Sequence, residues 1–284
     1  MFPFAASEFR YSRPMNDQDM HGPKAAQRFP PVVDGPAFVR INGAATSPIL
    51  LACDHASPAI PAEYGTLGLD ATMFHRHIAY DIGAAALTRE LSRRLDAGAV
   101  LATFTRLLID PNRAEDDPTL IVKVSDGVFI PGNQTLDADE IERRLTRFHR
   151  AYHQAVEADL ASLRDRHDRP LFVGVHSFTP IMEGFERPWE VGVLWSRDDR
   201  LANALLERLD RQAGLCVGRN EPYSGRIAGY SMDRHGGRTG VAHAVVEVRQ
   251  DLIDTHHGLA RWADLLAAVL VDVRDDPRLA AKVG

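Results

Sequence analysis

The chain has 284 residues, of which 45% are hydrophobic and 25% charged, and its formal net charge is -6. This composition is typical of a globular protein with a sizeable core. Acidic and basic residues are interspersed without a basic stripe, which argues against nucleic acid as a partner. Cys53 and Cys216 are too few for a disulfide framework. Since no apolar run reaches the roughly 18 residues of a membrane span and Met1 to Ala6 lack a signal-peptide pattern, we expect a cytoplasmic protein without membrane contact.

Residues 1–30 mix Pro, Asp, Gln, Lys and Phe without periodicity and predict an extended N-terminal arm. No linker or repeat interrupts residues 31–284, which predicts a single domain. Apolar runs then alternate with segments of helical periodicity. The helical segment 137–166 has Asp137 as its expected N-cap. This alternation predicts an α/β fold of three layers, with helices on both faces of a mixed, mainly parallel sheet. The expected strands are 47–53, 99–104, 171–175, 190–195 and 243–248, and the expected helices are 78–95, 137–166, 200–213 and 259–273.

Titratable side chains gather where four of the expected strands end. The first strand runs into Asp54 and His55, the second is followed by residues 106–113, the third by His176, and the last contains Glu247. Ligands bind beyond the carboxyl ends of the strands in open α/β sheets. These side chains therefore predict one shared polar crevice.

Two histidines on different strands, His55 and His176, indicate a metal site. Zinc in hydrolases commonly takes three protein ligands from His, Asp and Glu, and it lowers the pKa of a bound water to about 7. His77 and Asp81 compete as the third ligand, because an i, i+4 spacing puts both on one side of a helix over 76–86. We prefer His77 and expect one Zn²⁺ per chain. The competing interpretation of His77 is a residue that caps the helix or supports a ligand.

Glu247 lies within the apolar run 245–248. Burying a carboxylate is costly unless it is paired or used. It could pair with an arginine near Arg249, or it could act as the general base that takes a proton from water and passes it to a leaving amine. We favour the general base.

The segments 220–226 and 233–237 are rich in Gly and Arg. Because Arg binds carboxylates through two parallel hydrogen bonds, this pair of loops predicts a site for an acidic substrate. The alternative is a surface loop with solvated arginines. His149 and His153 lie one helical turn apart and are expected to form a solvated or half-buried face of the long helix rather than a metal site.

Several segments resemble, in order, those of the N-formylglutamate amidohydrolase family. The resemblance implies hydrolysis of an N-formyl or N-acyl amide on an acidic amino acid. It also implies a fold similar to that of zinc carboxypeptidases and aspartoacylase-like enzymes, of the phosphorylase/hydrolase-like kind. It supports His55 and His176 as ligands and Glu247 as base. The matching segments are 53–57, 77–84, 106–113, 175–180, 220–236 and 247–253.

The expected partner is a small-molecule N-acyl amino acid, and the sequence leaves open whether the chain forms a homo-oligomer. One rival function is a zinc carboxypeptidase-like deacylase acting on another N-acyl amino acid or small peptide. Another is a non-catalytic binding module, which the joint presence of His55, His176 and Glu247 disfavours. The expected site comprises the catalytic residues Glu247 and Arg113, the metal ligands His55, His77 and His176, and the substrate-binding residues Arg106, Asn112, Ser177, Tyr223, Arg226, Arg234 and His235.

Overall fold

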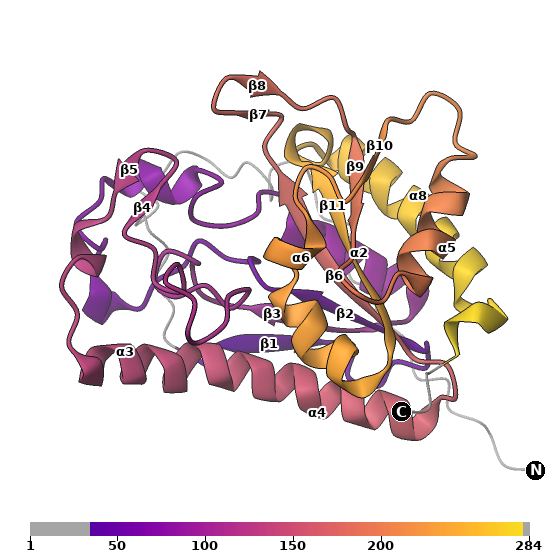
Figure 1. Cartoon of the computed structure of the whole chain (residues 1–284), viewed down its shortest axis with the longest axis horizontal. Helices are drawn as coiled ribbons and strands as arrows, with labels where there is room; N and C mark the ends of the chain where they lie inside the picture. The colour runs from indigo at the N-terminus through magenta and orange to yellow at the C-terminus, as the bar shows by residue number, and fades with distance from the viewer. Residues whose placement is uncertain (1–34, 281–284) are drawn as a thin grey trace, which may run out of the picture.

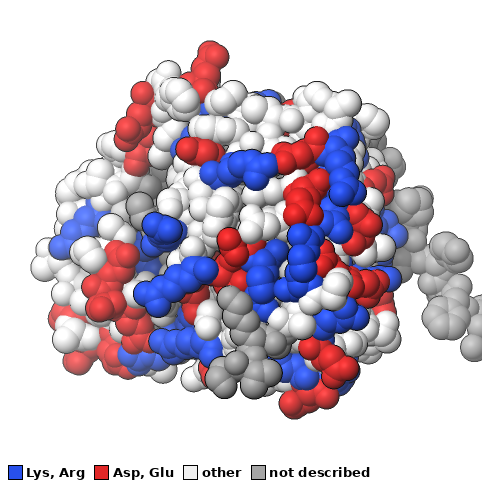
Figure 2. Space-filling model, turned by 45° about the vertical axis from the view of Figure 1, so that its right-hand side comes forward, with Lys and Arg blue, Asp and Glu red and all other residues white. Residues whose placement is uncertain are grey.

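A computed structural model describes residues 35–280 of the chain (Figure 1). The expected arm of residues 1–30 lies outside the described residues. Within residues 35–280, none of the helices combines the length and the hydrophobicity that a membrane span requires. Figure 2 shows acidic and basic side chains next to one another on one face of the molecule.

A seven-stranded sheet runs through the described part of the chain in the order β1-β3-β2-β6-β11-β9-β10. The strands β3, β2, β6 and β11 are parallel to one another, whereas β1 is antiparallel to β3 and β9 is antiparallel to β11. The predicted mixed, mainly parallel sheet is therefore confirmed. The strand bounds are β1 Phe38–Ile41, β2 Ile49–Cys53, β3 Gly98–Ala102, β6 Leu171–Phe178, β9 Val191–Leu194, β10 Val217–Arg219 and β11 Ala242–Arg249.

The interior strands are apolar along their whole length because both of their faces are covered. On one face, α2 (Ala84–Leu95), α5 (Arg200–Leu209) and α8 (His256–Arg274) bury their apolar sides in a common core (Figure 1). On the other face, α4 (Ala151–Arg166) lies along the sheet over a second core. The three predicted layers are confirmed.

One long helical stretch covers that second face. It begins with α3 (Ala138–Arg144), continues without a break through the π-helical segment η4 (Leu145–Arg150), and ends with α4. The side chain of Asp137 accepts a hydrogen bond from the backbone N–H of Glu140 (2.8 Å), as an N-cap does, which confirms the predicted start. Shorter helical turns lie near the same face: α6 (Gly225–Ala228), α7 (Tyr230–Met232) and the π-helical segment η5 (Asp233–Gly237).

The helix predicted over 78–95 begins only at Ala84. Gly83 has a φ of +83°, and the carbonyl and side chain of Ile253 lie against its α-carbon. A left-handed residue cannot continue a right-handed helix, so residues 76–82 form turns instead. The backbone N–H of Asp81 donates to the carbonyl of His55 (2.9 Å), which holds these turns over the end of β2.

Two small hairpins stand outside the main sheet. One pairs β4 (Val124–Ser125) with β5 (Val128–Phe129), and the other pairs β7 (Ile181–Met182) with β8 (Phe185–Glu186) (Figure 1). These two-residue strands, like the short β1 and β10, are absent from the elements expected from sequence because they are too short for a periodicity. The remaining 3₁₀ turns are η1 Ala62–Tyr64, η2 Ala71–His75, η3 Pro131–Asn133, η6 Gln250–Leu252 and η7 Pro277–Leu279.

Candidate active site

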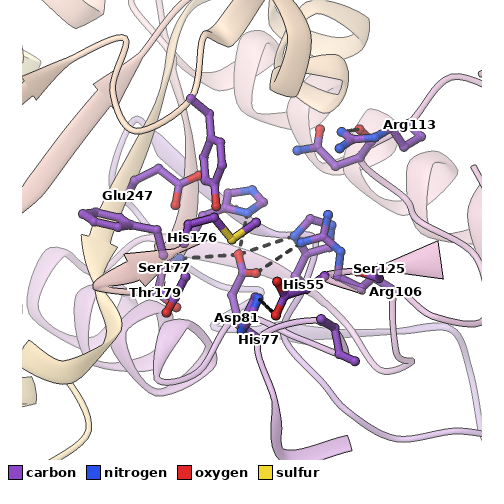
Figure 3. Close-up of a pocket in the computed structure, with 16 residues that line it drawn as sticks. His55, His77, Asp81, Arg106, Arg113, Ser125, His176, Ser177, Thr179 and Glu247 are labelled. Carbon is purple, nitrogen blue, oxygen red and sulfur yellow. Dashed lines mark hydrogen bonds and ion pairs between the residues drawn. The ribbon is translucent and has the colours of Figure 1, made fainter. Parts of the chain in front are cut away.

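A pocket of about 200 Å³ opens beyond the carboxyl ends of β2, β6 and β11, the three adjacent parallel strands at the centre of the sheet (Figure 3). The two hairpins contribute Ser125, Asp126 and Met182 to its wall. The structure thus brings most of the predicted site residues to one place. Those that line the pocket are His55, His77, Arg106, Asn112, Arg113, His176, Ser177, Tyr223 and Glu247.

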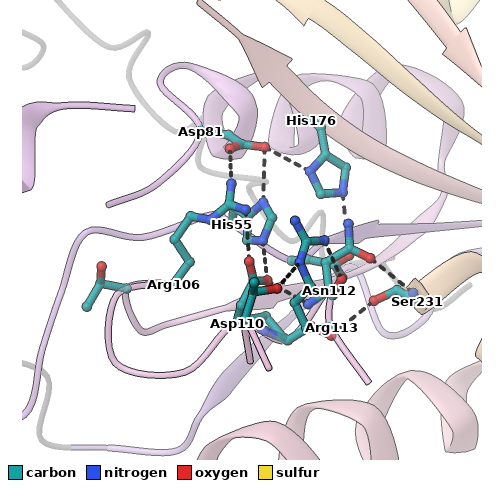
Figure 4. Close-up of polar contacts among 12 residues, drawn as sticks. His55, Asp81, Arg106, Asp110, Asn112, Arg113, His176 and Ser231 are labelled. Carbon is teal, nitrogen blue, oxygen red and sulfur yellow. Dashed lines mark hydrogen bonds and ion pairs between the residues drawn. The ribbon is translucent and has the colours of Figure 1, made fainter. Parts of the chain in front are cut away.

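The carboxylate of Asp81 lies between His55 and His176 (Figure 4). Both histidines turn their Nδ1 atoms toward the Oδ2 atom of Asp81, at 3.4 Å for His55 and 2.8 Å for His176. Their Nε2 atoms face two outer carboxylates, Asp110 at 2.7 Å from His55 and Asp54 at 3.4 Å from His176. All five side chains are buried. In metal sites, a histidine commonly offers one ring nitrogen to the metal while a carboxylate orients the other.

The residues fit a metal ion on two counts. Ligand atoms of His55, Asp81 and His176 lie within 4.8 Å of one another. The Nδ1 atom of His55 is buried and has no hydrogen-bond partner within the described residues. Such an atom is costly to bury unless something binds it, and a metal ion would do so.

The geometry of the described residues favours Asp81 over His77 as the third candidate ligand. The Nε2 atom of His77 lies 3.6 Å from Asp126, and the His77 side chain is 25% exposed, whereas Asp81 joins the two histidines. The choice assumed a helix over 76–86, which would have put both residues on one side. The turn that ends at Gly83 separates them instead.

Hydrogen bonds also fix the two outer carboxylates, Asp54 and Asp110. Asp54 accepts a hydrogen bond from the hydroxyl of Tyr152 (2.6 Å), and Asp110 accepts one from Arg106 (2.8 Å). Burial acts to raise the pKa of Asp110, but Arg106 and His55 hold it well below its ordinary value. Burial acts in the opposite direction on His55, whose pKa is nevertheless raised by Asp110 and Asp81. These shifts favour the ionised form of Asp110 and the protonated form of His55.

Glu247 stands apart from these pairs. Its residue in β11 is in register with His176 in β6, and its Oε2 atom is buried without a hydrogen-bond partner in the described part of the chain. Burial raises the pKa of Glu247 to about 7, although His176 opposes the shift. The alternative explanation for this carboxylate was an ion pair near Arg249, but Arg249 pairs with Asp251 (2.8 Å).

Arg113 brings a positive charge to the other side of the pocket. Its guanidinium group donates to two neutral oxygen atoms, the carbonyl of Asn112 (3.0 Å) and the hydroxyl of Thr119 (3.2 Å). Arg106, by contrast, is committed to the cluster, because it bonds to Asp110 and lies 3.6 Å from Asp81. Arg113 forms no such ion pair among the described residues, although its charge helps to lower the pKa of Asp110.

The family model of the N-formylglutamate amidohydrolases matches residues 47–254. The chain belongs to the N-formylglutamate amidohydrolase family. It is therefore a hydrolase that acts on amide bonds, and the predicted family is confirmed.

Two solved structures are similar to this family member over most of their length. The Agrobacterium tumefaciens gene product Atu2144 is 35% identical, with a TM-score of 0.81 and with 84% of this chain and 94% of that chain covered. An N-formylglutamate amidohydrolase from Ralstonia eutropha JMP134 is 20% identical, with a TM-score of 0.64 and with 84% and 97% covered. The second likeness shows the fold alone. A comparison with curated proteins gives no significant match.

Three predicted substrate-binding residues lie outside the pocket of this amidohydrolase. Arg226 is exposed, Arg234 donates to the hydroxyl of Tyr230 (2.7 Å), and His235 is buried against His153. Residues 220–224 form a loop as expected, whereas α6 begins at Gly225 and residues 233–237 form η5. None of the three side chains lines the pocket.

Sequence reasoning missed Arg187, which follows the β7–β8 hairpin. It is buried, stacks over the ring of Tyr223 at 4.7 Å and donates to the Tyr223 hydroxyl (3.0 Å). It therefore fixes a side chain of the pocket wall. No motif around Arg187 indicates this role, because the contact depends on how two distant loops meet.

We expect Tyr152→Phe to lower the free energy of unfolding by about 1–3 kcal/mol, because it leaves a buried oxygen of Asp54 without its donor. Urea unfolding of the full chain, followed by circular dichroism, measures the change. Tyr64→Phe is the matched control, since the buried Tyr64 hydroxyl has no hydrogen-bond partner among the described residues. Equal losses in the two variants would contradict a stabilising role for the bond to Asp54.

Proposed function

We propose that this amidohydrolase cleaves the N-formyl, or a closely similar N-acyl, amide of an acidic amino acid such as N-formylglutamate, with the help of a divalent metal ion. The observation that carries the proposal is the buried Glu247. Its pKa of about 7 suits proton transfer at neutral pH, and it shares one small pocket with a His-Asp-His group and with Arg113. The family description supports the substrate class.

The residues that would hold the metal are His55, Asp81 and His176. Two ring nitrogens and a carboxylate oxygen form a donor set that suits Zn²⁺. When bound, such an ion polarises a carbonyl group and makes water nucleophilic near neutral pH. Asp110 and Asp54 would keep the two imidazoles in place from the outer side.

Glu247 would act twice. It first accepts a proton from the attacking water as the water oxygen bonds to the formyl carbon. It then delivers that proton to the amide nitrogen, so that the C–N bond breaks and formate and the free amino acid are released. A carboxyl group with a pKa close to the working pH can both accept and donate, because neither form is strongly disfavoured.

Arg113 would bind a carboxylate of the substrate. The oxygen atoms that accept its two side-chain hydrogen bonds are neutral. A substrate carboxylate would bring a negative charge and would accept charge-assisted hydrogen bonds. The volume of about 200 Å³ favours a small molecule over a folded protein substrate.

We expect His55→Ala and Asp81→Ala each to abolish retention of the metal, with a loss of affinity beyond the roughly 10- to 100-fold typical of an outer partner. His77→Ala, at the rim of the pocket, should keep wild-type stoichiometry. Elemental analysis of the purified proteins measures the metal content. Retention in Asp81→Ala together with loss in His77→Ala would return the third ligand to His77.

Glu247→Gln should lower kcat by about 10²- to 10⁴-fold while leaving the metal content unchanged, because glutamine keeps the size but cannot accept the proton. Formate release from N-formyl-L-glutamate gives the rate, and elemental analysis gives the metal. Near-normal turnover would assign the proton transfer to another group. Loss of the metal would make Glu247 a ligand.

Arg113→Gln should reduce kcat/KM for N-formylglutamate by about 30-fold, roughly 2 kcal/mol, and should reduce it far less for a neutral N-formyl amino acid. Arg226→Gln is the control, because Arg226 is exposed and lies outside the pocket. The measurement is a panel of N-formyl and N-acetyl amino acids and short peptides. A selective loss in Arg226→Gln would contradict the assignment, and wild-type preference for a peptide would favour the deacylase rival.

A further inference from the structure

Two histidines of the long helical stretch, His149 in η4 and His153 in α4, are fully buried. The expectation of a solvated or half-buried face is therefore wrong. Both side chains reach the backbone of the loop that follows β3: the Nε2 atom of His149 lies 2.8 Å from the carbonyl oxygen of Arg113, and that of His153 lies 2.9 Å from the carbonyl oxygen of Pro111. A carbonyl can only accept, so both Nε2 atoms carry the hydrogen.

His235 in η5 extends this arrangement. Its Nε2 atom lies 2.9 Å from the Nδ1 atom of His153. A neutral imidazole carries one hydrogen, and that of His153 is already on Nε2, so its Nδ1 atom accepts and His235 donates. The hydrogen bonds run in one direction, from His235 to His153 to the carbonyl of Pro111.

The loop held in this way carries site residues (Figure 4). Asp110 orients His55, and Arg113 lines the pocket. Neither His149 nor His153 lines that pocket, so both act on it only through the loop backbone. Ser231 adds a further contact, because its backbone N–H donates to the side-chain oxygen of Asn112 (3.1 Å).

We propose that His149 and His153 are positioning residues for the amidohydrolase site, which donate hydrogen bonds to the backbone carbonyls of Arg113 and Pro111 and so hold residues 110–113 with Asp110 and Arg113 at the site. The proposal rests on the proposed function in one respect, the assignment of Arg113 to the substrate.

Charge around His149 and His235 favours the neutral rings. Burial lowers the pKa of His149, and Arg234 adds to the shift. The hydrogen bond to the carbonyl of Arg113 and the carboxylates of Glu115, 4.0 Å from Nδ1, and Asp110 oppose it. Burial lowers the pKa of His235 to about 4, with Arg234 and Arg238 adding to the shift and Asp54 opposing it.

The surroundings of His153 also favour its neutral form. Burial lowers its pKa well below the ordinary value, and His149, His235 and Arg234 add to the effect while Asp54 opposes it. A protonated His153 would also turn an N–H group toward the N–H group of His235, which breaks their hydrogen bond.

The direction of the pH dependence follows from these lowered values. An unfolded histidine takes up its proton near pH 6.5, whereas these three take it up only at lower pH in the folded state. Between about pH 6.5 and the folded pKa values, the unfolded state binds more protons. The contribution of these three histidines to the free energy of unfolding is therefore fully present above about pH 6.5 and decreases as the pH falls below it.

The test compares His149→Leu, which removes the donor, with His149→Gln, whose side-chain amide keeps a donor and does not titrate. Hydrogen–deuterium exchange of the full chain at pH 7 should show about 10-fold faster exchange over residues 110–114 in His149→Leu and near wild-type exchange in His149→Gln. The same His149→Leu variant should raise KM for N-formylglutamate about 10-fold, with metal content unchanged and kcat changed by only a few fold.

A second pair of variants tests His153 in the same way. His153→Leu should also show faster exchange over residues 110–114 at pH 7, whereas His153→Gln, whose side-chain amide can both donate and accept, should exchange at near the wild-type rate.

Unchanged loop exchange in His149→Leu would overturn the proposal, and so would equal KM changes in the leucine and glutamine variants. If His149→Leu does not fold, the His153 variants decide: unchanged loop exchange in His153→Leu overturns the proposal. Failure of the proposed function would appear as a wild type without hydrolysis, and it leaves the exchange measurements intact.

Discussion

The site is built around a problem of buried charge. Asp54, Asp81 and Asp110 lie at the ends of the central strands with almost no access to water, and carboxylates in such a place require matched positive charge. Arg106 supplies one such charge, and His55 and His176 supply two more when protonated. A divalent ion bound to two neutral imidazoles would carry the same charge as those two protons. Binding of the proposed metal ion in exchange for these two protons would leave the net charge of the pocket unchanged, and it would couple metal binding to pH.

Glu247 differs from these three aspartates. The positive groups are already matched by the three aspartates, so burial dominates at Glu247 and its pKa rises to about 7. The neighbouring strand carries His176, which keeps the shift from growing further. The site therefore contains two kinds of carboxyl group. The pKa values of the aspartates are lowered, whereas Glu247 can exchange a proton near neutral pH.

The central strands could be predicted because they are buried on both faces, and that burial produces uninterrupted apolar runs such as those ending at Cys53 and in β6. Parallel neighbours then bring their polar ends together, so His55, His176 and Glu247 could be found without coordinates. The choice between His77 and Asp81 could not be made in this way, since it depends on the backbone of Gly83 and on the side chain of Ile253, which is 170 residues away in sequence.

The buried histidines of the long helix escaped prediction for a related reason. Their hydrogen-bond acceptors are the backbone carbonyls of Pro111 and Arg113. Every residue has a backbone carbonyl, so the sequence does not indicate which one a histidine will contact. Arg226 and Arg234 were expected to bind the substrate because their segments are rich in Gly and Arg. Neither side chain lines the pocket, although the loop before Arg226 contributes Tyr223 to it.

The pocket has two kinds of wall, and this division bears on how the family can diversify. The ligand-bearing side belongs to the sheet, where any change disturbs neighbouring strands and a matched set of charges. The opposite side comes in part from Ser125 and Asp126 in one hairpin and Met182 in the other, each hairpin pairing only two residues per strand and projecting from the body of the domain. Insertions and substitutions in such projections are tolerated at little cost in stability. New substrate preferences can therefore evolve by reshaping the two hairpins, while the hydrolytic chemistry is inherited unchanged.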